Sequence, residues 1–210
     1  RKEVFRGKSV ASYALGTREL MAWLDRNPLI EFQGVEQVFD PIQIGRNPNF
    51  VAVFQARKVD LLGRVAFSIG KGNISSGPGE GADLFTGTEI SDGGRTVFGL
   101  PSRNPQGMPN IVVMLRDLRN QFHMRESIDV VVTEYGIANL KWRTIRERAQ
   151  ALVDIAHPDD RQKLVEQAKK KKILFSDQIF LSESARLYPM EITTERIFQD
   201  GLKVRFRAIK

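Results

Sequence analysis

The hydrophobic positions of this sequence follow two alternating patterns, one with the two-residue period of strands and one with the spacing of amphipathic helices. Apolar and β-branched runs predict strands at 10–15, 50–56, 60–69, 96–100, 111–115 and 129–133. Apolar residues three to four positions apart predict helices at 18–27 and 144–156, and a further helix begins at His157-Pro158. Because strands alternate with helices, we predict an α/β fold with an open, largely parallel sheet flanked by helices.

Four local features refine this prediction. A turn at 58–60 is predicted to pair the strands at 50–56 and 60–69. The run 129–133 is β-branched enough to be a buried central strand. The glycine-rich stretch 70–94 is predicted to be irregular except at 82–85, either as a simple connection or as a loop where the backbone approaches a ligand. Residues 192–209 predict a C-terminal β-hairpin extension.

The composition narrows the chemistry. The chain has 210 residues, no cysteine and two histidines that lie far apart. This composition excludes disulfides, thiol catalysis and cysteine-based metal sites and argues against a histidine-rich metal site. No apolar run approaches the roughly 20 residues that span a bilayer. We therefore expect a cytoplasmic protein without a membrane partner, built as one domain with an extension.

The charge and the ends of the sequence carry further expectations. The net charge is +7, which would suit nucleic acid, but the basic residues are interspersed with acidic ones and the only pure run is Lys169–Lys172. Such a run is typical of a solvated helix end, although an anionic ligand would suit the same charge. We expect no nucleic-acid partner. Both ends look cut from a longer protein, since the first residue is not methionine and the last strand has no evident partner.

Nine short motifs in a fixed order give the sequence a family resemblance. Together they cover about residues 10–170 and resemble the C-terminal half of the acetyl-CoA hydrolase/transferase family, which includes acetate, succinate and 4-hydroxybutyrate CoA-transferases. The motifs are Ala14-Leu-Gly16, Asn27-Pro-Leu-Ile-Glu-Phe32, Val59-Asp-Leu61 with Gly63, Ser68-Ile-Gly70, Gly93-Gly94, Leu100-Pro-Ser102, Val131-Val-Thr-Glu-Tyr-Gly136, Arg146-Glu-Arg-Ala149 and Ile155-Ala-His-Pro-Asp159. The resemblance predicts a family domain at 1–175.

The resemblance implies an activity that needs more than this chain. Family members have two similar α/β domains with the active site between them, and they react through a glutamyl-CoA thioester on a glutamate just upstream of this segment. We therefore expect no catalytic residue here and an inactive isolated chain. The implied partners are acyl-CoA, a small carboxylic acid and the N-terminal CoA-transferase domain of the same chain, and a homodimer is compatible with the family. Coenzyme A enters as a substrate, without a metal.

The resemblance also assigns a share of the binding site. Gly77, Gly79 and Asp83 match a family loop whose N–H groups form an oxyanion hole beside the CoA channel, while Glu80 replaces its last glycine. The Glu80 carboxylate must then point away from the channel or be neutralised by a base such as Arg103. Glu134 matches a family glutamate at the end of a central strand; alternatively, it caps a following helix or pairs with an arginine. The predicted CoA-binding residues are Gly77, Gly79, Glu80, Asp83, Glu134 and Arg103. We expect residues 70–94, residues 102–107 and Glu134 to converge at one edge of the sheet, at the carboxyl ends of the parallel strands.

Other positions depart from the family pattern. Phe39 and Phe54 stand where the family commonly has asparagine, and the loop 103–107 lacks the usual lysine. Glu89 imitates the context of the family nucleophile, but its position after the glycine loop marks it as an ordinary loop residue. These departures leave two alternatives, a substrate that differs from the common acids or a domain that only binds.

The tail carries a second resemblance. Tyr188–Ile192 and Asp200–Ile209 are similar to the opening strand of GNAT-type N-acetyltransferases, so residues 176–210 are interpreted as a linker and the first strands of a truncated GNAT-type domain. The leading hypothesis is the CoA-side domain of an acyl-CoA hydrolase or CoA-transferase of acetate metabolism. The alternative is a noncatalytic acyl-CoA-binding domain attached to an N-acetyltransferase.

Overall fold

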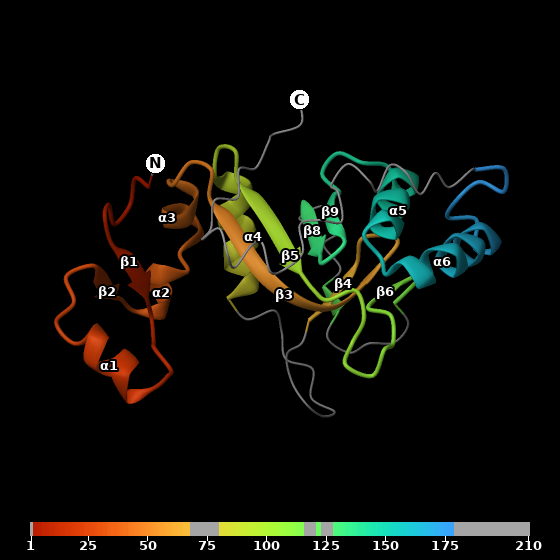
Figure 1. Ribbon diagram of the computed structural model, residues 1–210. Coiled ribbons are helices and arrows are strands. Elements are labelled where there is room, and N and C mark those ends of the chain that lie inside the picture. Colours follow the sequence, from red (N-terminus) through yellow and green to blue (C-terminus); the bar gives the residue numbers. More distant parts are fainter. Residues whose placement is uncertain (1, 68–79, 116–120, 123–127, 179–210) are drawn as a thin grey trace.

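The computed structural model describes residues 2–67, 80–115, 121–122 and 128–178. Within these ranges the chain forms a seven-stranded sheet with helices packed against it, and a small N-terminal part lies beyond one end of the sheet (Figure 1). The sheet is open and its central strands are parallel, so the predicted fold class is confirmed. The hairpin and the GNAT-type strands predicted in the tail lie outside the described residues.

The N-terminal part is a parallel β-α-β unit followed by two short helices. Its elements are β1 (Ser9–Ala11), α1 (Arg18–Leu24), β2 (Ile30–Phe32), α2 (Val35–Val38) and α3 (Pro41–Gly45), with β1 and β2 paired in parallel. The first strand and the first helix are thus both shorter than predicted. The helix ends early because Asp25 is extended and Arg26 takes a positive φ of 52°, which a helix cannot continue.

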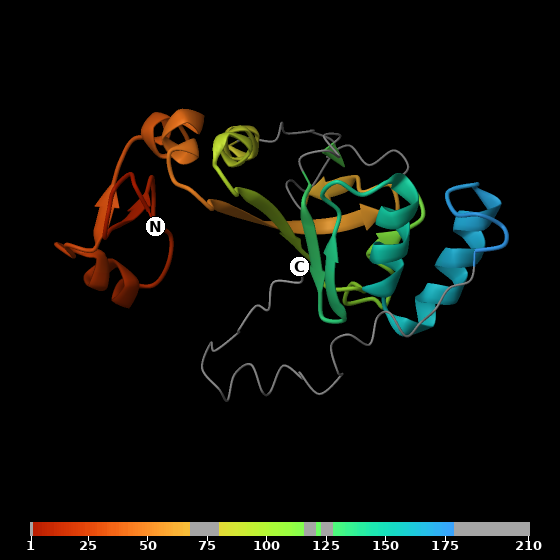
Figure 2. The same cartoon turned by 90° about the horizontal axis from the view of Figure 1, so that it is seen from above.

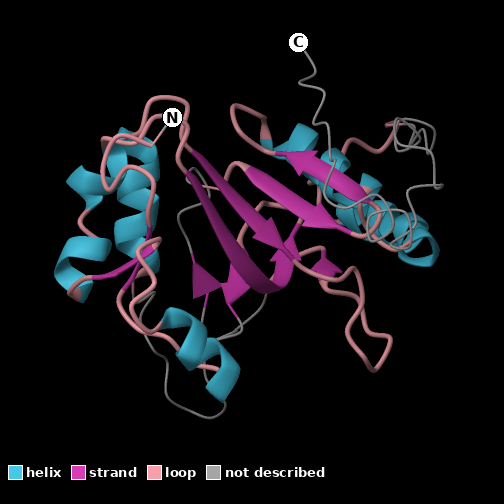
Figure 3. Ribbon diagram, turned by 60° about the vertical axis from the view of Figure 1, so that its left-hand side comes forward, coloured by secondary structure: helices cyan, strands magenta, loops and turns pink. Residues whose placement is uncertain are grey.

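The central sheet combines a parallel core with antiparallel edges (Figure 3). Its strands are β3 (Val51–Asp60), β4 (Val65–Phe67), β5 (Arg95–Gly99), β6 (Ile111–Val112), β7 (Gln121–Phe122), β8 (Val130–Thr133) and β9 (Gly136–Asn139). The order is β7-β4-β3-β5-β8-β9, with β6 also beside β3. Strands β3, β5 and β8 run parallel, β4 and β7 form one antiparallel edge, and β9 forms the other. The carboxyl ends of β5 and β8 therefore meet.

The first turn of the sheet lies after Asp60, so the turn predicted at 58–60 is wrong. Strand β3 continues through Asp60, whose Oδ1 accepts hydrogen bonds from the N–H groups of Leu62 and Arg64. Gly63 supplies the left-handed conformation that this turn needs, with a φ of +83°. The aspartate side chain therefore builds the turn from its own position at the strand end.

Helix α4 (Gly81–Ile90) occupies much of the stretch that we predicted to be irregular. The helix packs closely on α3, and glycine is required at the contact. A Cβ at Gly45 would lie 2.3 Å from Ile90 Cγ2, and one at Gly87 would lie 2.5 Å from Ile44 Cγ2. Within the glycine-rich stretch, Gly87 thus serves helix packing rather than a loop, and the irregular structure predicted for residues 81 and 86–90 is wrong.

The two last helices of the described chain agree with the sequence. Helix α5 (Ile145–Asp154) begins with a capping box between Thr144 and Glu147, and α6 (Pro158–Lys170) begins with His157 as its N-cap. The lysines of the last turn complement the negative end of the α6 dipole. Both helices contribute apolar side chains to the main core.

Phe54 belongs to an aromatic stack in this core. Its ring lies 4.8 Å from that of Phe85 on α4 and 5.2 Å from that of Phe98 on β5, measured between centroids. The stack joins the sheet to the helix above it, and such ring pairs add to the energy of simple burial. The aromatic residue at position 54 thus has a packing role.

Candidate functional site

Glu134 lies directly after β8, at the carboxyl end of the parallel strands. Thr133 pairs with Gly136, so Glu134 and Tyr135 form the tip of the tight turn between β8 and β9. Gly136 supplies a φ of +148° at the end of this turn. A strand follows instead of a helix, so the alternative that Glu134 caps a following helix is wrong.

The carboxylate of Glu134 is held by Ser102, which comes shortly after β5, the neighbour of β8. The Ser102 N–H donates to Oε2 at 2.8 Å, and the hydroxyl donates to Oε1 at 2.5 Å. Ser102 is only 1% exposed, so its donors are fixed in place. The structure therefore brings Ser102 and Glu134 together at the sheet edge, as expected for the ends of parallel neighbours. The predicted contribution of residues 70–79 lies outside the described residues.

Opposing influences set the pKa of Glu134. Burial raises it, whereas the hydrogen bonds from the Ser102 side chain and backbone lower it, with smaller lowering contributions from the Glu134 backbone and the charge of His157. The net effect holds the pKa below the ordinary value of 4.5. Glu134 is therefore ionised at neutral pH. A carboxylate offers about four acceptor positions, so the two donors of Ser102 leave room for further hydrogen bonds.

The β8–β9 turn is anchored to the corner between α5 and α6. Thr133 Oγ1 donates to the Ile155 carbonyl at 2.6 Å and accepts from the Tyr135 N–H at 3.1 Å. The Tyr135 ring meets His157 edge to face, with centroids 5.3 Å apart, and the Arg161 guanidinium lies over the same ring. These contacts fix the backbone on either side of Glu134.

Arg103 is engaged by acidic residues at the start of α6. Its Nε and Nη2 donate to the two carboxylate oxygens of Asp160 at 2.8 Å each, and Asp159 lies 3.5 Å from Nη1. This pairing raises the pKa of Arg103 and lowers that of Asp160. Arg103 is therefore not the neutralising partner that we suggested for Glu80. Its predicted contact with CoA remains a prediction, while its geometry anchors the loop after Ser102 to α6.

Glu80 stands at the N-cap of α4. The Leu84 N–H donates to the Glu80 carbonyl, so the N–H groups of residues 81–83 have no partner inside the helix. The side chain of Glu80 is exposed and makes no capping hydrogen bond. A negative charge is favourable at this end of a helix dipole, which gives a physical reason for a glutamate here. Gly77 and Gly79 lie outside the described residues.

Asp83 lies in the first turn of α4 and faces the N-terminal part of the chain. It lines a shallow hollow with Phe39 and Pro41 and with the acidic residues Glu36 and Asp40. Asp40 is itself used as the N-cap of α3, where it accepts from the Ile42 N–H at 2.9 Å. The hollow joins two positions that the sequence singled out, Phe39 and Asp83, but no described contact joins them to Glu134.

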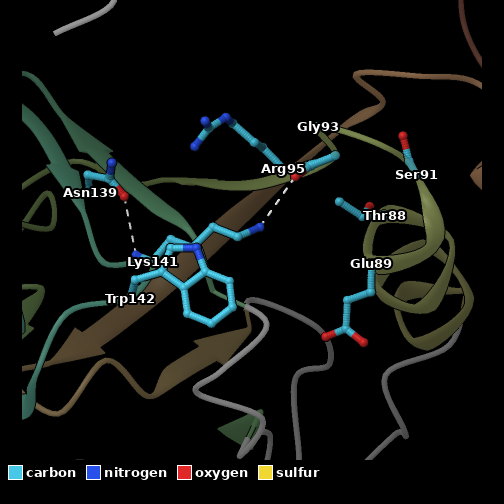
Figure 4. Close-up of a pocket in the computed structure, with 9 residues that line it drawn as sticks. Thr88, Glu89, Ser91, Gly93, Arg95, Asn139, Lys141 and Trp142 are labelled. Atoms are coloured by element: carbon cyan, nitrogen blue, oxygen red, sulfur yellow. Dashed lines mark hydrogen bonds between the residues drawn. The ribbon is translucent and has the colours of Figure 1, made fainter. Parts of the chain in front are cut away.

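A second pocket, of about 370 Å³, lies at the start of β5, whereas Glu134 lies at the carboxyl ends of the strands (Figure 4). It is formed where α4 ends and β5 begins, and Glu89 lines it together with Arg95, Lys141 and Trp142. Glu89 lies in α4, so its prediction as a loop residue is wrong. Lys141 Nζ lies 3.3 Å from Asp129 Oδ1 and 3.5 Å from the Gly94 carbonyl. This pocket is remote from the carboxyl ends of β5 and β8, so Glu89 and Glu134 do not form one site.

The structure places Ser102 and Glu134 at the same edge of the sheet, as predicted, while their role in binding CoA remains a prediction. The hydrogen bonds between the two residues, and the partner of Arg103, were not predicted. Asp160 was identified only as a helix-start residue. Within the described ranges no group of three or more histidine or acidic residues forms a metal site, and no helix is long and apolar enough to cross a bilayer.

Comparison with known proteins identifies, along most of the chain, the family that the sequence motifs resemble. Residues 16–168 match the profile described as "Acetyl-CoA hydrolase/transferase C-terminal domain". The chain is 37% identical over 173 residues to 4-hydroxybutyrate coenzyme A transferase of Clostridium kluyveri, covering 81% of this chain and 40% of that protein. It is 39% identical over 172 residues to succinyl-CoA:cyclohexane-1-carboxylate CoA transferase of Geobacter metallireducens, covering 81% of this chain and 39% of that protein.

A solved structure supports the same relationship. The crystal structure of RipA from Yersinia pestis superposes with a TM-score of 0.71 at 31% identity, covering 82% of this chain and 38% of RipA. The chain thus spans about two fifths of the length of the relatives it matches. The family profile ends at residue 168, so it gives no support to the start of an N-acetyltransferase predicted in the tail. With a collinear match over residues 16–168 and the matching fold, this chain belongs to the acetyl-CoA hydrolase/transferase family, as a C-terminal domain.

Proposed function

We propose that this chain is the CoA-side domain of a CoA-transferase or acyl-CoA hydrolase whose nucleophilic glutamate lies upstream. The observation that carries the proposal is the ionised Glu134, locked by Ser102 at the carboxyl ends of two parallel strands in a chain of this family. Open α/β sheets bind ligands at that edge. The relatives from Clostridium kluyveri and Geobacter metallireducens are CoA-transferases by their names, which supports the same reaction class here.

The chemistry divides between the two parts of the protein. The upstream glutamate would attack the thioester carbonyl of an acyl-CoA, giving a mixed anhydride and releasing the CoA thiolate. The thiolate would then attack the glutamyl carbonyl, giving the glutamyl-CoA thioester and the free carboxylate. A second carboxylic acid, or water in a hydrolase, would resolve that thioester. This chain would supply hydrogen bonds that hold CoA and stabilise the oxyanion.

Glu134 is suited to binding rather than to nucleophilic attack. Both of its oxygens already accept hydrogen bonds from Ser102, which lowers its basicity. Its remaining acceptor positions can receive N–H or O–H donors, and the pantetheine arm of CoA carries both kinds. We assign Glu134 to orienting that arm, and the N–H groups at the start of α4, which have no partner inside the helix, to the oxyanion. Gly77, Gly79, Asp83 and Arg103 remain proposed members of this binding site.

The test is a CoA-exchange assay on the full-length protein with acetyl-CoA and propionate. Glu134→Gln should weaken CoA-dependent turnover by roughly 10- to 100-fold, since hydrogen bonds to a charged group are worth about 1.5–3 kcal/mol. Glu166→Gln, an exposed change of the same chemistry on α6, is the control and should leave the rate unchanged. CoA binding without any transfer or hydrolysis would favour the noncatalytic alternative.

Glu80 provides a separate test in the full-length protein. If Glu80 only occupies the favourable end of the α4 dipole, Glu80→Gly should change turnover little. If the domain is a latent transferase that Glu80 impairs, Glu80→Gly should raise activity or CoA affinity, because an unpaired carboxylate beside a developing oxyanion raises the barrier. Loss of all activity would show that Glu80 is a working part of the site and that treating it as a departure is wrong.

A further inference from the structure

One face of the central sheet is uncovered in the described chain. Strand pairing places alternate residues of β3, β5, β8 and β9 on the same side, since Val53 pairs with Val97 and Val97 with Val130, while Val132 pairs with Ile137. We call this side the open sheet face. Its residues are Val51, Val53, Gln55, Arg95, Val97, Gly99, Val130, Val132, Ile137 and Asn139.

The open sheet face is mainly apolar and strongly exposed. Val53 is 71% exposed, Val51 is 50% exposed and Ile137 is 43% exposed. The other valines of the face are only half-buried. A contiguous exposed patch of β-branched side chains marks an interaction surface more often than an ordinary protein surface.

The opposite face of the same strands is covered. Phe54, Phe98, Val131 and Ala138 alternate with the exposed positions and join the core together with residues of α4 and α5. Figure 2 shows α4 on one side of β3 and β5, while no described helix lies on the other side. Sheets made only of parallel strands occur almost only with both faces buried, and three of the four strands that carry this face, β3, β5 and β8, run parallel. A second layer is therefore missing from the described structure.

We propose that the open sheet face is covered, in the full-length protein, by the part of the same polypeptide that this chain does not span. The relatives named above are longer, with this chain matching about two fifths of each, and the family description calls it a C-terminal domain. The inference rests on the proposed function, because both take this chain to be one domain of a longer enzyme. It adds the surface through which the two parts are joined.

A second uncovered surface favours this occupant over another copy of the chain. Among the described residues, half of the exposed large apolar side chains lie between residues 13 and 42. In that region α1 buries none of its residues, and β1 and β2 form an isolated parallel pair. Such a pair is not stable alone. A long segment of the same polypeptide can cover both surfaces. A second copy of the chain, bound through a single two-fold interface, would have to cover both surfaces with that one interface.

The experiment measures cysteine protection in the full-length protein. This chain has no cysteine, so Val53→Cys introduces a single reporter of nearly the same size within it, and Ile145→Cys, an exposed position at the start of α5, is the matched control. Maleimide labelling is followed by peptide mass mapping in native buffer and in urea. We expect labelling of Val53→Cys to be on the order of 100-fold slower in native buffer than in urea. The control should be labelled at similar rates in both.

The possible outcomes separate the proposed occupant from its competitors. Rapid native labelling of Val53→Cys would overturn the proposal. Protection that disappears when the protein is diluted to a monomer would assign the face to a second copy, and protection that disappears on deletion of residues 179–210 would assign it to this chain's own tail; either result rejects the proposed occupant. The measurement requires no turnover, so an inactive protein with a protected Val53→Cys would contradict the proposed function and leave the interface intact.

Discussion

The two faces of the central sheet are made by alternate residues of the same strands, yet only one face is buried against helices in the described chain. On the covered side Phe98 and Val131 are fully buried. On the open sheet face Val53 and Val97 are also apolar, but Val53 is exposed and Val97 is only half-buried. A half-exposed strand would be expected to place polar residues at those positions. The sequence of the strands therefore reflects a more complete assembly than the described chain forms.

The largest expected effect separates the faces within the 210-residue chain. Phe98→Ala removes a fully buried ring from the aromatic stack and should lower the free energy of unfolding by about 4 kcal/mol. Val97→Ala, one residue earlier and on the open sheet face, should cost less than about 1 kcal/mol. Urea unfolding followed by circular dichroism measures both. Equal losses would show that the faces are equally packed.

A charge on the open sheet face should have opposite consequences in the short chain and in the full-length protein. Val53→Glu should change the stability of the 210-residue chain by about 0.5 kcal/mol or less, because its side chain remains in water. In the full-length protein the same change should cost about 3 kcal/mol, because it would leave an unpaired charge buried. Thermal unfolding of both proteins is the measurement. An equally small effect in the two would be evidence against the missing layer.

Ser102→Ala is expected to have a smaller effect, confined to the sheet edge. It removes one of the two donors to Glu134 and should lower the free energy of unfolding by about 1 kcal/mol. It should also raise the pKa of Glu134, which NMR titration can follow. If the pKa of Glu134 does not move, the Ser102 hydroxyl does not hold the carboxylate in solution.

The smallest effect concerns the ion pair that ties the covered side to the loop after β5. The pKa of Asp160 is lowered from its ordinary 3.8, chiefly by Arg103. Its stabilising contribution should therefore be complete above that ordinary value and be lost as the pH falls through the lowered one. The stability difference between the wild type and Asp160→Asn should be constant from pH 8 to 5 and vanish in stronger acid. A difference that changes near neutral pH would contradict this origin.

Elements with a clear period were predictable from the sequence, and elements set by distant contacts were not. Strands β5 and β8 and helices α5 and α6 follow their apolar patterns, and the caps of α5 and α6 are local. Most of helix α4 escaped prediction because Gly87 serves contact with α3, which only the fold reveals. The turn at Asp60 was misplaced because a side-chain hydrogen bond, not composition, sets its position.

The same distinction applies to the candidate site. The place of Glu134 at a strand end was readable from the run of valines before it. Its hydrogen bonds with Ser102 join residues 32 positions apart, and the Arg103–Asp160 pair joins residues 57 positions apart. A local reading therefore gave Arg103 a suggested role beside Glu80 that the ion pair with Asp160 replaces. Long-range pairs of this kind depend on strand order and helix placement.

The most direct test of the central claim is to locate the covalent intermediate. The full-length protein would be incubated with acetyl-CoA, and the glutamyl-CoA thioester would be reduced with borohydride and mapped by mass spectrometry. The 210-residue chain would be treated in parallel. The account predicts one modified glutamate in the full-length protein, upstream of this chain, and none in the chain alone. A modified Glu80, Glu89 or Glu134 would contradict it, because the nucleophile would then lie within this domain.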